Sequence, residues 1–418
     1  MRRLDAAIII LIIAIVLGVV MRVEAWEKIA KVDVLTMSSD SVSYNGIAKN
    51  LLAGKGYSSP NHMIARQDQP TAFYAPTYPF YLVALYYVFG PSTKAGVMSH
   101  MILAIATIPL IYLLGMRLYG RVEGAIASLI YAVSPDIIHY NIMLTSETLF
   151  FVLEICLSIL IVGIFKKDRP SLWMLAATGL VFGVTYLCRQ TVIFLPALIV
   201  LGLWLRFKDN GYSWLLKSTG VFLVAAVLLI VPWTIRNYMV FGEPVFSTTT
   251  GPATLWWGTY EDKGTPLGVL IDRYRERHSD KNEVQMSQMM TKEAIQRIKH
   301  MSGTDIRGLL HQRVRRLFGF PRVYDLRKQQ TVTGLFYLVL GVLGIAGLLI
   351  ASKGKYERQL LMLTVVLTML LHIFTLTVFR YLMPLVPFLG LGAANLLSYV
   401  ATRIKAVFQA YGVRLTAS

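Results

Sequence analysis

The sequence APTYPFYLVALYYVFG at residues 75–90 decides how the rest of the chain is threaded through a membrane. This stretch is apolar and rich in tyrosine, but it is short and two prolines stand near its start. A membrane-spanning helix needs about 20 mostly apolar residues. Whether 75–90 makes a crossing therefore has to be decided from the segments around it.

The composition is that of a polytopic membrane protein. Hydrophobic residues make up 55% of the chain, charged residues only 15%, and the mean hydropathy is +0.56. The net charge is +18, but the basic residues sit mostly in short loops between apolar segments. That distribution indicates membrane topology rather than nucleic-acid binding. Cys156 and Cys188 both lie in apolar segments, which predicts small buried side chains rather than a disulfide or a metal pair.

Ten segments are apolar enough to be predicted as spanning helices. The first resembles a signal peptide, but no clear small-residue cleavage site follows it and many more apolar segments do. The ten predicted spans are 6–22, 94–114, 121–138, 143–165, 171–188, 190–206, 215–234, 331–351, 358–377 and 381–400.

Basic residues in short loops predict the orientation of these spans, because such loops are usually cytoplasmic. Arg2 and Arg3 place the N-terminus in the cytoplasm. Five further clusters agree with ten crossings only if 75–90 does not cross, since an extra crossing would invert every later loop. We therefore expect 75–90 to be an interfacial or re-entrant helix in the first outer loop. The five clusters are Arg117/Arg121, Lys166/Lys167/Arg169, Arg206/Lys208/Lys217, Lys353/Lys355/Arg358 and Arg403/Lys405/Arg414.

This topology predicts an all-α polytopic membrane protein in three parts. Residues 1–237 form a transmembrane module whose outer loop, 23–93, contains an aspartate. Residues 238–330 form a small α-rich domain outside the cell, and 331–418 supply the C-terminal transmembrane helices. Both termini are expected in the cytoplasm.

Asp40 is the first candidate for chemistry, in the stretch MSSDSVSYNGIAKNLLAGKGY at 37–57. Ser38 or Ser39 is a suitable N-cap, which places Asp40 in the first turn of a helix. The helix dipole favours its ionised form, and an ionised carboxylate is what a general base needs. Asp40 and Tyr44 share one helix face, so packing of that face would fix the acid. The alternative is that Asp40 only begins the helix.

Glu147, in IMLTSETLFF, is the second candidate, and it is predicted on the same side of the membrane and at the same depth as Asp40. Capping of the helix by Thr145 or Ser146 would explain the local pattern. A carboxylate at the rim of an apolar helix is nevertheless costly unless it is paired, which favours a functional or metal-binding role. The sequence contains no zinc-type spacing and no phosphate-cradling glycine loop, so a divalent metal is expected only if Asp40 and Glu147 bind it.

Arginines on the outer side are exceptions to the rule that basic residues face the cytoplasm, so we expect each to have a binding partner. A lipid phosphate is one partner, because a guanidinium binds phosphate oxygens with two parallel hydrogen bonds. The alternative is ordinary contact with lipid headgroups, which we also expect for Arg313, Arg315 and Arg316. The candidates for phosphate are Arg66, Arg189, Arg236 and Arg380.

Two adjacent tryptophans, Trp256 and Trp257, lie in the predicted outer domain. Either could stack on a sugar ring, and a membrane-interface belt explains them equally well.

Six blocks of the chain, taken in order, resemble bacterial family 39 glycosyltransferases. These are membrane proteins of the C-type glycosyltransferase fold, related to dolichyl-phosphate-mannose–protein mannosyltransferases and to the lipid A aminoarabinose transferase. The resemblance covers nearly the whole chain. The blocks are DSVSYNGIAKNLLAGKGY, QPTAFYAPTYPFYLVALYYVFG, SPDIIHYNIMLTSETLFF, GLVFGVTYLCRQTVIFLPAL, PWTIRNYMVFGEPVFSTTTGPATLWWG and FRYLMPLVPFLGLGAA.

The resemblance implies that Asp40 is the catalytic aspartate of the first outer loop and Glu147 the second acid. It also implies that Arg189 and the Arg380–Tyr381 pair occupy recurring positions at outer helix ends. Two positions depart from the family pattern. Ser41 stands where many relatives have a second acid, and Ala75 where some have a lysine or arginine. These departures weaken the case for a metal held by adjacent acids and for a lysine on the donor phosphate, which Arg66 is the candidate to replace.

The expected function is transfer of a sugar from a polyprenyl phosphate to an acceptor hydroxyl on a lipid, glycan or protein. Asp40 would act as general base outside a bacterial inner membrane, with inversion at the anomeric carbon. The donor-phosphate candidates are Arg66, Arg189, Arg380 and Tyr381, and the acceptor or sugar candidates are Tyr44, Trp256, Trp257 and Arg236.

A transporter or lipid flippase is the main alternative. Such proteins commonly show internal repeats and acids at mid-membrane, whereas this chain shows no repeat and places its acids at helix ends. An inactive relative that serves as an assembly partner is a third possibility, and the presence of both acids argues against it.

Overall fold

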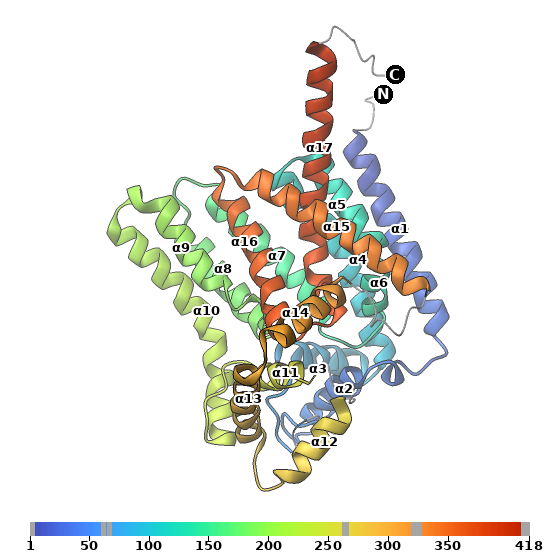
Figure 1. Ribbon diagram of the computed structural model, residues 1–418, viewed down its shortest axis with the longest axis vertical. Helices are drawn as coiled ribbons and strands as arrows, with labels where there is room; N and C mark the ends of the chain where they lie inside the picture. Colours follow the sequence, from blue (N-terminus) through green and yellow to red (C-terminus); the bar gives the residue numbers. More distant parts are fainter. Residues whose placement is uncertain (1–4, 60–63, 65–68, 261–266, 319–327, 411–418) are drawn as a thin grey trace.

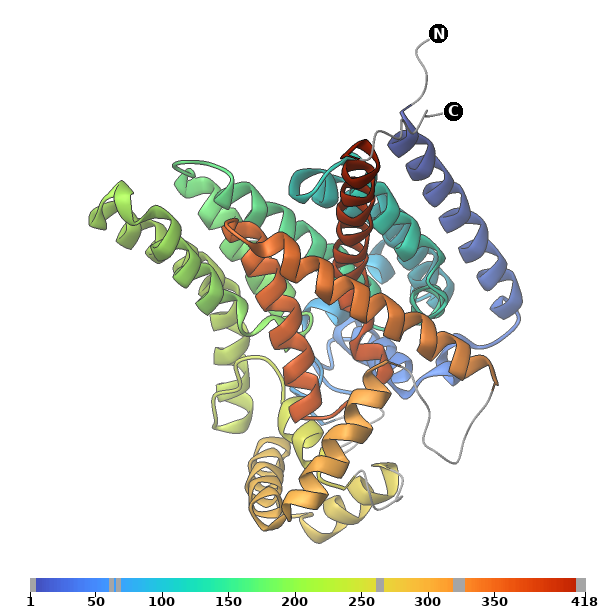
Figure 2. The ribbon, with the colours of Figure 1, turned by 45° about the horizontal axis from the view of Figure 1, so that its top comes forward.

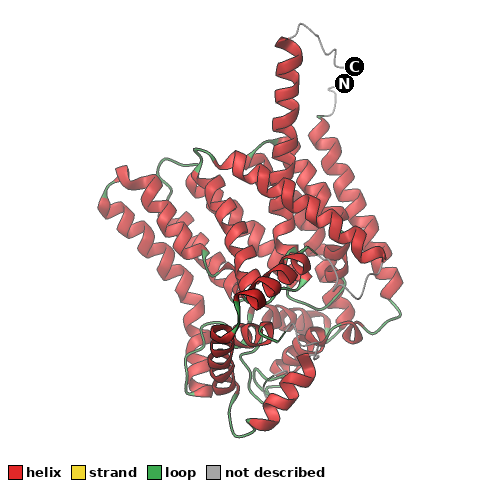
Figure 3. Cartoon of the chain, in the orientation of Figure 1, coloured by secondary structure: helices red, strands yellow, loops and turns green. Residues whose placement is uncertain are grey.

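The computed structural model describes residues 5–59, 64, 69–260, 267–318 and 328–410, and these residues are almost entirely helical (Figures 1 and 3). Long helices run side by side through the upper part of the view, and shorter helices gather at the lower end. Among the described residues the only β pairing outside named strands is an isolated bridge between Ser58 and Pro70. The protein is therefore an all-helical, multi-pass membrane protein, as predicted.

Among the described residues, eight helices are long and apolar enough to cross a membrane. Six are single α-helices: α1 (Ala6–Ile29), α4 (Thr93–Leu118), α7 (Glu147–Phe165), α10 (Tyr212–Phe241), α15 (Lys328–Ser352) and α16 (Tyr356–Phe374). The other two are composite. Gln190–Asn210 contains α9 (Leu195–Phe207), and Phe379–Gln409 contains η5 (Phe379–Tyr381), η6 (Met383–Leu385) and α17 (Val386–Ala410).

Two of the ten predicted spans are shorter than expected. The span at 121–138 divides into α5 (Arg121–Val133) and α6 (Pro135–Asn141), because Ser134 precedes a proline and adopts an extended backbone. The span at 171–188 ends early as α8 (Leu172–Tyr186), and the chain is extended at Arg189. Both short helices still belong to the bundle: α5 packs against α1, α4 and α17, and α8 against α7 and α10.

The segment at 75–90 forms α3 (Thr77–Phe89), which has 13 residues and is too short to cross a bilayer. It begins after Pro76 and ends at Gly90, whose φ of 76° is unfavourable for other residues. It packs against α2 (Ser39–Leu52) at the lower end of the molecule. This placement agrees with the expected interfacial helix in the first loop.

Four more helices complete the lower end: α11 (Thr250–Gly258), α12 (Leu267–Arg277), α13 (Glu283–His300) and α14 (Gly303–Leu317) (Figure 1). Glu283 at the start of α13 joins them to the first loop. Its buried carboxylate accepts hydrogen bonds from the Thr71 hydroxyl (2.8 Å), the Ala72 amide (2.9 Å) and the Thr249 hydroxyl (2.6 Å). Distant segments of the chain are thereby held in one arrangement.

Helices α15 and α17 cross in close contact (Figure 2). Gly347 faces Gly392 at the crossing, and a Cβ on Gly347 would overlap the Gly392 carbonyl oxygen. Small residues allow helix backbones to approach in this way inside a membrane.

We expect Gly347→Ala to lower the free energy of unfolding by about 1–3 kcal/mol, because the added methyl group overpacks the crossing. Thermal unfolding in detergent measures the change. Gly220→Ala is the matched control, since nothing lies within 4 Å of its Cβ position on α10 and alanine favours a helix. Equal stability of the two variants would contradict the prediction.

Candidate active site

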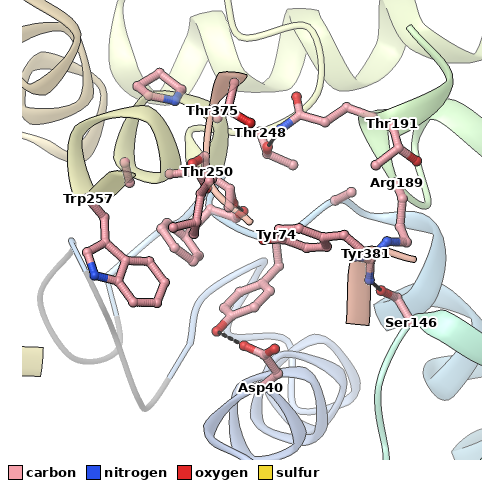
Figure 4. Close-up of a pocket in the computed structure, with 18 of the residues that line it drawn as sticks. Asp40, Tyr74, Ser146, Arg189, Thr191, Thr248, Thr250, Trp257, Thr375 and Tyr381 are labelled. Atoms are coloured by element: carbon pink, nitrogen blue, oxygen red, sulfur yellow. Dashed lines mark hydrogen bonds between the residues drawn. The ribbon is translucent and has the colours of Figure 1, made fainter. Parts of the chain in front are cut away.

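A cavity of about 620 Å³ lies where the lower ends of the long helices meet α2 and α11 (Figure 4). Its walls come from the start of α2, the loop before α3, the start of α7, the segment 188–193, the segment 248–257 and the link between α16 and α17. Side chains that are far apart in the sequence therefore meet in one place. This size is typical of sites that bind small molecules.

Asp40 lies in the first turn of α2, where Ser38 is the N-cap and its hydroxyl accepts from the Asp40 amide (3.2 Å). Arg380 Nη1 lies 2.6 Å from Asp40 Oδ2, and the Tyr74 hydroxyl donates to Oδ1 at 3.2 Å. Burial and the charge of Asp40 raise the pKa of Tyr74 well above its usual value, so Tyr74 keeps its proton and remains a donor. The carboxylate of Asp40 is therefore held from two sides while its side chain stays 18% exposed.

Glu147 begins α7 and is buried, with Arg189 Nη1 2.7 Å from its Oε1. Ser146 occupies the N-cap position but makes no side-chain capping bond. Its hydroxyl instead accepts from Arg189 (3.2 Å) and from the Tyr44 hydroxyl (3.3 Å). An ion pair with Arg189 thus neutralises the acid at the rim of this apolar helix. Tyr44 connects α2 to the same place through its hydrogen bond to Ser146.

Three polar atoms at the cavity are buried without a hydrogen-bond partner among the described residues. They are Arg189 Nε, Arg380 Nε and Thr191 Oγ1. A buried donor without a partner is costly, so such atoms are explained when a ligand binds there. Each arginine holds an acid with one nitrogen and still has a donor left for an anion.

The structure brings together most of the residues predicted for the site. Besides both ion pairs, Tyr44, Trp257 and Tyr381 line the cavity. The Tyr381 ring stacks on His372, with ring centroids 4.2 Å apart. Tyr74 was missed as an individual site residue, because its sequence context shows only one of several interfacial tyrosines.

Two of the three remaining predicted residues do not line the described cavity. Trp256 is buried and donates to Glu293 on α13 (2.9 Å). Arg236 donates to the carbonyl oxygens of Thr71 (2.8 Å) and Tyr57 (3.0 Å), so it braces the first loop. Arg66 lies outside the described residues.

The donor set around the cavity does not fit a divalent metal. Asp40 and Glu147 are each already paired with an arginine. The described residues contain no group of three or more His, Cys, Asp or Glu that could hold a metal ion. We derive no step through a metal.

Part of the chain matches a family of known proteins. Residues 68–235 match the family model described as dolichyl-phosphate-mannose-protein mannosyltransferase. No curated protein matches the sequence.

Solved structures with a similar fold include the Archaeoglobus fulgidus oligosaccharyltransferase in its apo form, with a TM-score of 0.62 and 14% identity over 100% of this chain and 53% of that chain. The A. fulgidus oligosaccharyltransferase AglB in complex with an inhibitory peptide and a dolichol-phosphate has a TM-score of 0.59 and 14% identity, over 99% of this chain and 52% of that chain. ArnT from Cupriavidus metallidurans bound to undecaprenyl phosphate has a TM-score of 0.40 and 16% identity, over 96% of this chain and 79% of that chain.

The family match agrees with the resemblance over residues 68–235, and the oligosaccharyltransferase structures share their fold with the chain. The chain spans about half the length of the oligosaccharyltransferase structures that it matches.

We expect Arg189→Leu to lower the free energy of unfolding by about 3–5 kcal/mol, because it leaves the Glu147 carboxylate buried and unpaired. The double variant Arg189→Leu/Glu147→Gln removes that charge and should recover part of the loss. Thermal unfolding in detergent measures both. Arg206→Leu is the control, since its partner Asp168 is fully exposed and such pairs contribute about 0–1 kcal/mol. An Arg189→Leu protein as stable as the control would contradict the expectation.

Proposed function

We propose that this protein is a membrane glycosyltransferase that moves a sugar from a polyprenyl phosphate to an acceptor hydroxyl. The observation that carries the proposal is the pair of acids, Asp40 and Glu147, each held by an arginine around one cavity at the ends of apolar helices. The family match and the fold support it. The AglB complex supports a lipid phosphate as the donor carrier, because that related fold was solved with a dolichol-phosphate.

Asp40 is the proposed general base. Arg380 and Tyr74 occupy two positions on its carboxylate, and a carboxylate has about four lone-pair sites, so it can still accept a proton. The acceptor hydroxyl gives its proton to Asp40 while its oxygen attacks the anomeric carbon. The bond between that carbon and the phosphate oxygen breaks, and the polyprenyl phosphate leaves with the electron pair. This single displacement inverts the anomeric centre, and a positioned base typically contributes about 10²–10⁴-fold.

Arg189 and Arg380 are the proposed cations for the leaving phosphate. Each has a buried Nε without a partner among the described residues, and fixed donors aimed at a developing charge are among the largest catalytic effects. Glu147 fixes the position of Arg189, and Tyr381 lies beside Arg380. Arg66 stays a candidate from the sequence.

The proposed location is a bacterial inner membrane with the cavity on the outer side. In Figure 1 the start of α1 and the end of α17 lie at the upper end, as do the links that carry the basic clusters. The cavity lies at the opposite end. If basic loops face the cytoplasm, the acceptor reaches Asp40 from outside, where a polyprenyl-phosphate sugar supplies the stored energy and no nucleotide sugar is needed.

The transporter or flippase alternative places acids within the membrane-spanning path. Here both acids lie at helix starts, beside the helices of the lower end.

We expect cells that carry Asp40→Asn to accumulate a polyprenyl-phosphate sugar and to lose one glycosylated product, as cells without the protein do. Mass spectrometry of envelope lipids and glycans measures both masses, which would also name the donor and acceptor. The control is Asp209→Asn, an exposed acid in another loop, which should behave as wild type. Detergent-extracted protein levels confirm that Asp40→Asn is folded. If the folded Asp40→Asn protein matches wild type while the deletion has a phenotype, transport or assembly becomes the better interpretation.

A further inference from the structure

One wall of the cavity carries hydroxyl groups and no charge. Thr250, Thr254 and Trp257 are spaced i, i+4 and i+7 on α11, so they share one helix face, and all three line the cavity. Trp256 faces away and is anchored to Glu293 on α13. This anchor determines which face α11 turns to the cavity, and Figure 4 shows Thr250 and Trp257 on it.

The hydrogen bonds of this wall fix the direction in which it can bond a ligand. Thr250 donates its hydroxyl proton to the Phe73 carbonyl, and Thr254 donates to the Thr250 carbonyl (2.8 Å). Thr375, across from α11, donates to the Leu371 carbonyl (2.7 Å). A hydroxyl has one proton and two lone pairs, so these three oxygens are left to accept.

Two neighbouring hydroxyls lie beside these three oxygens, and neither donates its proton to an acceptor among the described residues. Thr248 accepts from the Gln190 amide (2.9 Å), and Thr191 Oγ1 is buried without a partner among the described residues. The charged groups that line the cavity are the two ion pairs, and the His372 ring stacks on Tyr381. A second anion on the substrate would find no further arginine or lysine among these lining residues.

We propose that the threonine wall, meaning Thr250, Thr254, Trp257 and Thr375, binds the hydroxyl groups of a sugar that carries no carboxylate or phosphate. Sugar hydroxyls donate to oxygens that can only accept, and Trp257 offers an apolar face for the ring. A carboxylate or phosphate also only accepts, so it would lie against lone pairs without a hydrogen bond. The inference rests on the proposed function and narrows its substrate.

The sugar can belong to the donor or to the acceptor, and binding measurements separate the two. Native mass spectrometry of the full-length protein in detergent would compare undecaprenyl phosphate with synthetic undecaprenyl phosphates that carry glucose or glucuronate. The test variant is Thr254→Val/Thr375→Val. The control is Thr364→Val, which removes the same kind of bond, to the Leu360 carbonyl, elsewhere on α16 and does not line the cavity.

If the wall binds the donor sugar, wild type binds the glucose lipid about tenfold or more tightly than the glucuronate lipid, and the double variant loses this preference. Each lost hydrogen bond weakens binding by about three- to tenfold. Undecaprenyl phosphate binds equally to all three proteins. If the wall binds the acceptor sugar, the double variant leaves lipid binding unchanged, and cells accumulate the donor and lose the product.

The proposal is overturned if the double variant matches Thr364→Val both in lipid binding and in product formation. It is also overturned if the transferred sugar in the wild-type product is acidic. Formation of a glycosylated protein that the double variant leaves intact overturns it as well. If wild type binds none of the three lipids, the proposed function fails and this inference fails with it. Binding of undecaprenyl phosphate without any effect of the double variant rejects the threonine wall alone.

Discussion

The ion pair between Asp40 and Arg380 joins residues that are 340 positions apart, and both residues line the cavity. Asp40 comes from the first turn of α2, and Arg380 comes from the link between α16 and α17. The pair between Glu147 and Arg189 completes a set of two positive and two negative groups. Apolar helix ends can hold this set because each charge has a close opposite charge, whereas removal of one member would strand another in a poorly solvated place.

The position of Asp40 depends on a chain of contacts that begins outside the bundle. Glu283 on α13 holds Thr71 and Ala72, and Tyr74, two residues further on, donates to Asp40. Arg236 supports the same loop through the Thr71 carbonyl. The lower helices and the first loop thus form one support for the Asp40 carboxylate. Loss of Glu283 would therefore disturb the position of Asp40, even though Glu283 does not line the cavity.

Local sequence patterns were sufficient to predict the short helix at 75–90 and the all-helical membrane fold, and they pointed to the two acids that line the cavity. Helix-start residues and hydropathy are short-range signals, because they depend on neighbouring residues and not on how the helices pack. The partners of the acids carry no such signal, because the contact between Asp40 and Arg380 depends on how all the helices between them pack.

Dependence on helix packing also explains why the structure differs from the predictions for Trp256 and Arg236. Two neighbouring tryptophans point about 100° apart on a helix, so only the packing of α11 decides that Trp257 lines the cavity and Trp256 does not. Arg236 was expected to meet a ligand and instead meets two backbone carbonyls, which are invisible in a sequence pattern. The proline at 135 was visible, but its effect on the span at 121–138 was underestimated.

In the proposed reaction, Arg380 stands between the two charges that change. It holds Asp40 through Nη1, while its Nε has no partner among the described residues. As the bond to the phosphate breaks, the leaving oxygen gains negative charge and attracts the guanidinium more strongly. At the same moment Asp40 accepts a proton and loses the charge that held Arg380. Arg380 can therefore follow the negative charge from the base to the leaving group, which couples proton removal to bond cleavage. The proposed base is therefore paired with the same cation that the leaving phosphate attracts.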